Sequence, residues 1–183
     1  KLSARLVLVR DLYKEESELR CMTERFMTED VLFGYVTNLC ISDYFDAEKL
    51  EDARRCACDA STPLIIIGTG AGMVAPGATL VYVDMARWEI QQRCRRHEVK
   101  ALGIDNREDA VSLQYKRGYF NDWRICDRYK STLFEHVDYW LDSHIPGSPK
   151  MIDRQTFYKG IDKTASKPFR VVPYFDQAPW GGQ

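Results

Sequence analysis

The stretch Leu64-Ile65-Ile66-Ile67-Gly68-Thr69-Gly70-Ala71-Gly72 decides the fold class. Its four apolar residues without alternation predict a strand that is covered on both faces, as in a parallel sheet. A second strand of this kind is expected over residues 79–83, and it leads into Asp84. Such strands alternate along the chain with segments of helical periodicity. This alternation predicts an α/β domain in which a mainly parallel sheet is flanked by helices.

The remaining elements are expected on either side of this centre. Asp46 is expected to cap one helix and Asn106 another, because a short polar side chain accepts free N–H groups at a helix start. The last helix, which begins near Asp153, is expected to bury Phe157 and Ile161. Further strands are predicted over residues 5–9 and 137–141, and helices over residues 16–27, 46–58, 86–98, 107–117 and 123–134.

Composition narrows the class of protein. The 183 residues are 45% apolar and 12% aromatic, which excludes a disordered chain and a disulfide mini-scaffold. Lys and Arg total 26 and Asp and Glu total 27, so a net charge of −1 argues against a nucleic-acid or anionic-membrane surface. The apolar runs are too short for a membrane span. Because the chain begins at Lys1 and stops at Gln183 without the character of a natural end, we expect a piece of a longer protein.

Cysteine and histidine spacing predicts no metal centre in this segment. The six cysteines form no Cys-x-x-Cys pair, and only Cys56 and Cys58 are close together. The three histidines lie far from them in the sequence, so paired zinc-ligand spacings are missing. Scattered thiols of this kind favour structural, buried cysteines and a reducing, cytoplasmic location.

The glycine turn that follows the first buried strand has three interpretations. Backbone N–H groups beside Gly68, Gly70 and Gly72 can cradle a phosphate because no Cβ blocks the approach. The spacing Gly70-x-Gly72-x-x-Ala75 also fits a dinucleotide fingerprint, although Pro76 would interrupt the required helix. The third interpretation is a tight connection that needs positive φ angles. No lysine occurs between Gly68 and Arg87, so the lysine of a Walker loop is missing.

Asp84 follows the second buried strand, at the edge where α/β folds bind ligands. A carboxylate there can hold Mg²⁺ through water, as in sites of phosphoryl transfer. The alternative is that Asp84 caps the helix that begins near Ala86. No catalytic residue is assigned, because no acid–base or nucleophile constellation stands out.

Arginines concentrate in the helix after Asp84. Residues 87–100 hold five basic and two acidic side chains, a local balance of 5 − 2 = +3. Arg93, Arg95 and Arg96 are candidate phosphate ligands, because the guanidinium group contacts phosphate through two N–H groups. The alternative is a solvated helix face with a Glu89–Arg93 pair.

A second dense polar group lies in the segment before residue 130. It is a candidate interaction face, although ion pairs along a helix explain the composition equally well. The face comprises Asp122, Trp123, Arg124, Asp127 and Arg128.

The tail resembles the start of a known enzyme family. Residues 167–175 and 179–183, which end in Trp180-Gly181-Gly182-Gln183, are similar to the entry into the cupin domain of type I mannose-6-phosphate isomerases. This resemblance implies that residues 163–183 are a connector and the start of a downstream isomerase domain. The zinc of that domain, and its His, Glu and Gln ligands, would then lie beyond Gln183.

Residues 63–96 resemble the second half of P-loop kinases of the uridine-kinase and nucleoside-kinase type. The likeness rests on the strand that ends at Gly68, the strand that ends at Asp84 and the lid-like arginines after it, and on residues 137–142 as a late strand. Residues 117–130 are similar to kinase-like extensions that precede isomerase-related cupins. The resemblance implies that residues 1–162 form a P-loop-kinase-like domain with a degenerate phosphate loop.

These likenesses lead to one main functional hypothesis and two alternatives. The main hypothesis is an accessory, non-catalytic kinase-like domain of a protein that interconverts mannose 6-phosphate and fructose 6-phosphate. Its partners would be the downstream cupin domain and a sugar phosphate or nucleotide, with Mg²⁺ as a candidate ion. The alternatives are an active sugar or nucleoside kinase with an atypical phosphate loop, and a protein-interaction module.

Overall fold

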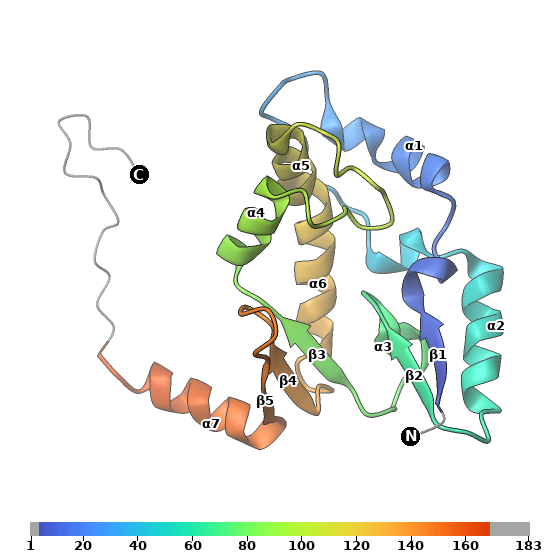
Figure 1. Cartoon of the computed structure of the whole chain (residues 1–183), viewed down its shortest axis with the longest axis vertical. Helices are drawn as coiled ribbons and strands as arrows, with labels where there is room; N and C mark the ends of the chain where they lie inside the picture. The colour runs from blue at the N-terminus through green and yellow to red at the C-terminus, as the bar shows by residue number, and fades with distance from the viewer. Residues whose placement is uncertain (1–3, 169–183) are drawn as a thin grey trace.

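The computed structural model describes residues 4–168, which form an α/β arrangement of helices and two small sheets (Figure 1). Residues 169–183, which hold most of the expected connector, lie outside the described residues. Within residues 4–168, no helix is both long and apolar enough to cross a membrane. In chain order the elements are β1 (Arg5–Leu8), η1 (Val9–Leu12), α1 (Glu16–Met27), η2 (Ile41–Tyr44), α2 (Ala47–Cys58), β2 (Leu64–Ile67), α3 (Ala71–Val74), β3 (Val81–Asp84), α4 (Arg87–Arg95), α5 (Val111–Arg117), η3 (Gly118–Asp122), α6 (Trp123–Leu133), β4 (Tyr139–Asp142), β5 (Lys150–Asp153) and α7 (Arg154–Ala165).

The described strands pair in two sheets. In the first sheet β1 runs parallel to β2, with Leu6 opposite Ile65. In the second sheet β3 runs parallel to β4, and β4 runs antiparallel to β5. The prediction of an α/β domain with parallel strands is therefore confirmed. Strand β5 was not predicted, because its four residues directly precede a helix and contain two charged side chains.

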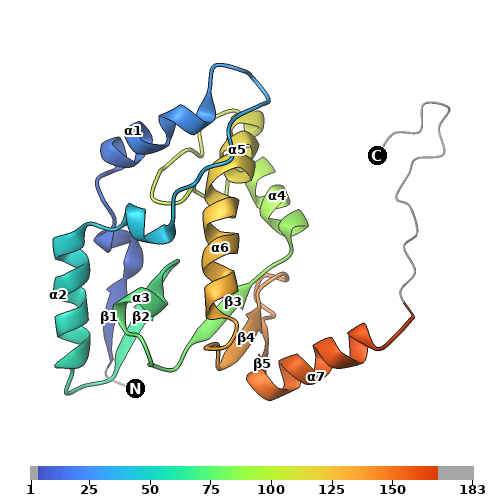
Figure 2. The same ribbon diagram turned by 180° about the vertical axis from the view of Figure 1, so that it is seen from behind.

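One face of the strands is exposed, and the prediction that residues 64–67 are covered on both faces is wrong. Ile65 and Ile67 are 50% and 54% exposed. Val81 and Val83 on β3 are exposed in the same alternating pattern. Figures 1 and 2 show α3 and α6 on the same side of the strands. Among the described elements, a layer of helices therefore covers the other face only.

Helices α1 and α2 confirm the sequence-based boundaries. α1 buries Leu19 and Phe26, which lie seven residues apart on one helical face. α2 begins after Asp46, whose side chain accepts the backbone N–H groups of Glu48 and Lys49 at 3.0 Å. This cap satisfies two donors that have no partner inside the helix.

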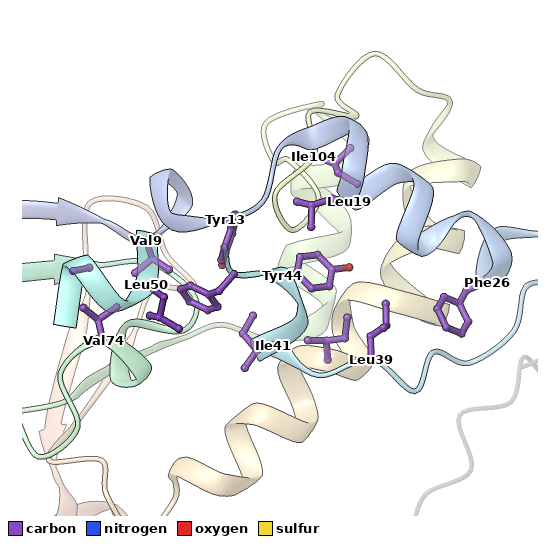
Figure 3. Close-up of a cluster of buried hydrophobic side chains, with 13 residues drawn as sticks. Val9, Tyr13, Leu19, Phe26, Leu39, Ile41, Tyr44, Leu50, Val74 and Ile104 are labelled. Atoms are coloured by element: carbon purple, nitrogen blue, oxygen red, sulfur yellow. The ribbon is translucent and has the colours of Figure 1, made fainter. Parts of the chain in front are cut away.

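The main core lies between α1, η2, α2 and the first sheet (Figure 3). Aromatic rings form its centre: the Tyr13 ring meets the Phe45 ring edge-on, with centroids 5.2 Å apart. Tyr44 is fully buried beside them, and its hydroxyl accepts an N–H from Asn121. The other buried members are Val9, Leu19, Phe26, Leu39, Ile41, Leu50, Ala53, Val74, Ile104 and Ile125.

Two predictions about later helices are wrong. Asn106 does not cap α5, which begins only at Val111; its Oδ1 accepts the Ala101 N–H at 2.9 Å instead. α7 is capped by Asp153, but it buries no residue completely. Phe157 is half-buried and stacks on another aromatic ring, whereas Ile161 is 43% exposed. The second prediction failed because α7 extends away from the other described elements beyond its contacts with β4 and β5 (Figure 1).

α7 also crosses the expected boundary at residue 162 and ends at Ala165. The connector was expected to begin at residue 163, and most of it falls on residues that are not described. The division into residues 1–162 and 163–183 therefore stays a prediction.

Candidate functional site

A cavity of about 350 Å³ lies at the carboxyl ends of the parallel strands. Thr69 follows β2, Asp84 ends β3, and Ser143 follows β4, and all three line this cavity. In α/β folds, ligands bind at this edge because the strands end there and the loops diverge. We therefore take the cavity as the candidate site.

Helices and one loop complete the wall opposite the strands. They contribute apolar side chains together with amides, a carboxylate and a lysine, which is the mixture typical of small-molecule sites. The contributing residues are Ile90, Cys94, Val99, Lys100, Ala101, Asn106, Gln114, Gly118, Asp122, Trp123 and Cys126.

Asp84 is held by an ion pair and does not cap a helix. Its Oδ2 lies 2.6 Å from Nζ of Lys130, and its Oδ1 accepts the Met85 N–H at 3.0 Å. α4 begins after Ala86 without a side-chain cap, so the interpretation of Asp84 as its cap is wrong. The Lys130 ammonium also lies 5.2 Å from the centre of the Tyr82 ring. The strand-end acid is therefore neutralised by a lysine of α6.

Asp122 lies in the cavity wall and not on the surface. It is 6% exposed, and its carboxylate accepts N–H groups from Asn121 at 2.9 Å and from Leu102 at 3.1 Å. Burial raises the pKa of Asp122, while the Arg117 guanidinium and the two hydrogen bonds act in the opposite direction. The residue ends the π-helix η3, a rare geometry that is frequent at functional sites.

The other members of the expected interaction face divide between the cavity and the surface. Trp123 is half-buried and lines the cavity, and the Arg87 guanidinium lies 4.5 Å from the centre of its ring. Asp127 is exposed and accepts two hydrogen bonds from Arg87 at 3.0 Å. Arg124 and Arg128 each donate to a backbone carbonyl. An interaction face built from the exposed members stays a prediction.

The glycine turn packs against the core. Gly68 and Gly70 have φ angles of +136° and +95°, so the positive φ angles expected of a tight connection are present. A Cβ on Gly70 would lie 2.7 Å from the Phe45 ring, and one on Gly68 would lie 2.8 Å from Cβ of Val9. Gly72 belongs to α3, which ends after four residues, before Pro76. The backbone at these glycines is thus shaped by contacts with the core.

Only one of the three candidate arginines reaches the cavity rim. Arg93 forms the expected pair with Glu89 at 2.9 Å and donates to the backbone oxygen of Ser143 at 3.1 Å. Arg96 pairs with Glu89 as well, at 3.2 Å. Arg95 is exposed, with its guanidinium 5.9 Å from the centre of a tryptophan ring on α4. The structure therefore does not bring the three guanidinium groups together at one point.

Two buried amides in the cavity wall were missed as site residues. Gln114 is 4% exposed, and its Nε2 donates to the backbone oxygens of Asp109 at 2.9 Å and Arg107 at 3.2 Å. Its Oε1 is buried and has no hydrogen-bond partner among the described residues. Asn106 is also buried and lines the same wall. Nothing in the local sequence marks Gln114, because a glutamine in a short helix is usually a surface residue.

The expectation of buried cysteines is wrong for four of the six. Cys94 is buried and Cys126 is half-buried, and both line the cavity. Burial raises the pKa of the Cys126 thiol to about 12, so it is protonated at neutral pH. In the part of the chain that the structure describes, no three His, Cys, Asp or Glu side chains lie close enough to hold a metal ion. The exposed cysteines are Cys21, Cys40, Cys56 and Cys58.

Comparison with protein families identifies one match. A model of the domain of unknown function DUF8485 matches residues 2–166, which include the cavity and all described strands. The chain belongs to this family. No curated protein and no solved structure matches it.

In this DUF8485 chain the cavity combines buried hydrogen-bond acceptors with cations near its edge. The acceptors are the Asp122 carboxylate and the Gln114 Oε1 atom. Lys100 lines the cavity, and its Nζ pairs with Asp105 at 2.6 Å; Arg93 reaches the rim through Ser143. The acceptors can hold a polar molecule that carries donor groups, and a negative charge on that molecule would share the two cations with Asp105 and Glu89.

Proposed function

We propose that this chain is the accessory, non-catalytic α/β domain of a type I mannose-6-phosphate isomerase-related protein, and that its cavity binds a phosphorylated small molecule. The observation that carries the proposal is the cavity at the carboxyl ends of β2, β3 and β4. In α/β folds this edge is the usual place for phosphorylated ligands. The likeness of residues 167–183 to the entry of the isomerase cupin supports the context.

In this proposal the isomerisation takes place in the downstream cupin domain, which follows on the same chain. That domain would hold zinc and interconvert mannose 6-phosphate and fructose 6-phosphate in the cytoplasm. The domain described above would bind a sugar phosphate or a nucleotide, and it would retain a kinase-like fold with a degenerate phosphate loop.

Three observations favour binding over phosphoryl transfer. The Asp84 carboxylate, the candidate magnesium ligand, is paired with Lys130 at 2.6 Å. Gly68 and Gly70 are shaped by contacts with Val9 and Phe45. The sequence also offers no lysine in the glycine turn to offset the charge of a triphosphate.

Titration calorimetry on the 183-residue chain tests the proposal with inorganic phosphate, mannose 6-phosphate and ATP. We expect at least one of these anions to bind, and Lys100→Met to weaken that binding about tenfold, because one charge-assisted contact is lost. Lys159→Met is the matched control, since Lys159 lies on α7 and does not line the cavity. Absence of binding for all three anions, or isomerase turnover by this chain alone, would contradict the proposal.

The first alternative is an active small-molecule kinase, which the position of Asp84 in the cavity favours. A catalytic Mg²⁺ would have to displace Lys130 from the Asp84 carboxylate. The test is ADP release from ATP and Mg²⁺ with a panel of sugars and nucleosides. Release that disappears in Asp84→Asn would establish the kinase, and equal background in both proteins would remove it.

The second alternative is an interaction module, which the exposed apolar face of the strands favours. Parallel strands normally have both faces covered, yet Ile65, Ile67, Val81 and Val83 are exposed. Under this alternative the downstream domain covers that face. Calorimetry with the separate cupin domain should then show binding that Ile67→Ser weakens, whereas Leu113→Ser, at an exposed position on α5, leaves it unchanged. Phosphate binding without cupin binding would exclude this alternative.

A further inference from the structure

Gln114 lines the cavity and carries a buried acceptor for which the described residues supply no donor. The side chain is 4% exposed, and its Nε2 already donates to the carbonyls of Asp109 and Arg107. These two bonds fix which end of the amide is nitrogen, because a carbonyl oxygen cannot donate to another carbonyl. Oε1 is therefore left without a partner within residues 4–168. A buried acceptor of this kind is unfavourable unless a ligand or water supplies an N–H or O–H group.

Asp122 adds a second set of acceptors to the same wall. Its two oxygens receive one N–H each, from Asn121 and from the backbone of Leu102. A carboxylate offers about four acceptor positions, so about two stay open. Asp122 lines the cavity together with Gln114. The inner wall therefore offers open hydrogen-bond acceptors, which a ligand with donor groups can fill.

The cavity edge has the opposite character. Lys100 lines the cavity, and its partner Asp105 is exposed. Arg93 reaches the edge at Ser143, which follows β4. Both cations are already paired with carboxylates, Lys100 with Asp105 at 2.6 Å and Arg93 with Glu89 at 2.9 Å, so a bound anion would share them with these partners. The inner wall, in contrast, offers open hydrogen-bond acceptors. A ligand that fits both ends carries hydroxyl groups on one side and a phosphate on the other.

The size of the cavity restricts the ligand further. Its volume of about 350 Å³ lies near the lower end of the range for ligand sites, which is about 300–1,000 Å³. This volume favours a single sugar ring with one phosphate over a dinucleotide.

We propose that Gln114 and Asp122 bind the hydroxyl groups of a monosaccharide phosphate in this cavity. The inference rests on the proposed function, because it assumes that the cavity binds a phosphorylated molecule. It adds the substrate class and the two side chains that distinguish a sugar phosphate from other phosphates.

The test compares three ligands by calorimetry on the unaltered 183-residue chain: mannose 6-phosphate, ethyl phosphate and adenosine monophosphate. Ethyl phosphate carries the same anion without sugar hydroxyl groups. We expect mannose 6-phosphate to bind at least tenfold more tightly than either of the others. This comparison needs no variant, so it remains decisive if a substitution prevents folding.

Variants then test which side chains bind the sugar hydroxyl groups. Gln114→Met should weaken binding of mannose 6-phosphate about tenfold and leave binding of ethyl phosphate unchanged, because the hydroxyl contact is removed and the phosphate contacts are kept. The substitution also removes the two Nε2 hydrogen bonds to Asp109 and Arg107, so circular dichroism must first show that the variant folds. Asp122→Asn should act in the same direction. Gln92→Met is the matched control: the Gln92 Nε2 atom is also buried without a partner among the described residues, but Gln92 does not line the cavity.

The outcomes separate the two proposals. Equal affinity for mannose 6-phosphate and ethyl phosphate, or tighter binding of adenosine monophosphate, overturns the inference and leaves phosphate binding in place. An unchanged affinity of Gln114→Met for mannose 6-phosphate also overturns it. If none of the phosphates binds, the proposed function itself fails.

Discussion

The substitution Gly70→Ala measures how tightly the glycine turn is packed. Gly70 has a φ of +95°, and a left-handed backbone costs a residue with a Cβ about 1–2 kcal/mol. The added Cβ would lie 2.7 Å from Cζ of Phe45, and overpacking of a core typically costs about 1–3 kcal/mol. The two effects add to about 2–5 kcal/mol. We expect the free energy of unfolding to fall by this amount.

Gly77→Ala is the matched control. Gly77 has a φ of +84°, but a Cβ there would meet no atom of the described residues within 4 Å. This variant bears the backbone strain alone, about 1–2 kcal/mol. Alanine also lowers the conformational entropy of the unfolded chain by a similar amount at both positions, so that effect cancels in the comparison.

Urea denaturation followed by circular dichroism gives the two free energies. The difference between the variants should be about 1–3 kcal/mol, with Gly70→Ala the less stable, because only Gly70 meets the Phe45 ring. Equal stability of the two variants would refute the reasoning. The turn would then have room for a side chain, and an open phosphate cradle would again be a plausible reason for its glycines.

Three further predictions concern α7, Asp122 and the thiols. Phe157→Ala should detach α7, because the Phe157 ring stacks on the Trp140 ring with centroids 4.1 Å apart. Without that contact the 12-residue helix should unfold, since isolated helices shorter than about 12–15 residues have marginal stability in water. Loss of helical circular dichroism without global unfolding would confirm this. The raised pKa of Asp122 means that its contribution to stability is fully present below the unfolded-state pKa and is lost as pH rises through the folded-state pKa. Over that interval the free energy of unfolding should therefore fall relative to that of Asp122→Asn. A difference between the two proteins that stays unchanged from acid to neutral pH would count against a raised pKa. Four thiols should react rapidly with a thiol reagent, whereas Cys94 and Cys126 should react only after denaturation, because burial shields them and raises their pKa values. Rapid reaction of all six thiols would contradict the packing around the cavity.

The elements that the sequence predicted well are those whose signals are local. α1 shows spaced apolar residues, and α2 starts at the Asp46 cap, whose two hydrogen bonds involve only the next three residues. These interactions join residues within about one helical turn, so they do not depend on how other segments fold. The failures concern burial, which depends on other segments. Ile65 and Ile67 have the composition of a doubly covered strand, but no described helix covers their side of the sheet.

The burial of Asp122, one of the five residues of the expected interaction face, depends on a change in helical period. A regular helix has 3.6 residues per turn, which places successive residues about 100° apart. The π-helix Gly118–Asp122 has a wider turn and accommodates one extra residue. Each extra residue rotates the subsequent side chains by about 100°, so a side chain assigned to the solvent face can enter the interior. Gly118 is part of this geometry, because a Cβ there would lie 2.6 Å from the Trp123 ring.

The same geometry links the candidate site to the core. Asn121, which precedes Asp122 in the π-helix, donates both to the Asp122 carboxylate and to the hydroxyl of Tyr44. Arg117, at the start of this segment, donates to Thr23 of α1. These groups come from segments far apart in the sequence, and none is identifiable as a partner before the chain folds. The candidate site therefore depends on a buried polar network, and the linear order of residues could indicate only the strand ends beside it.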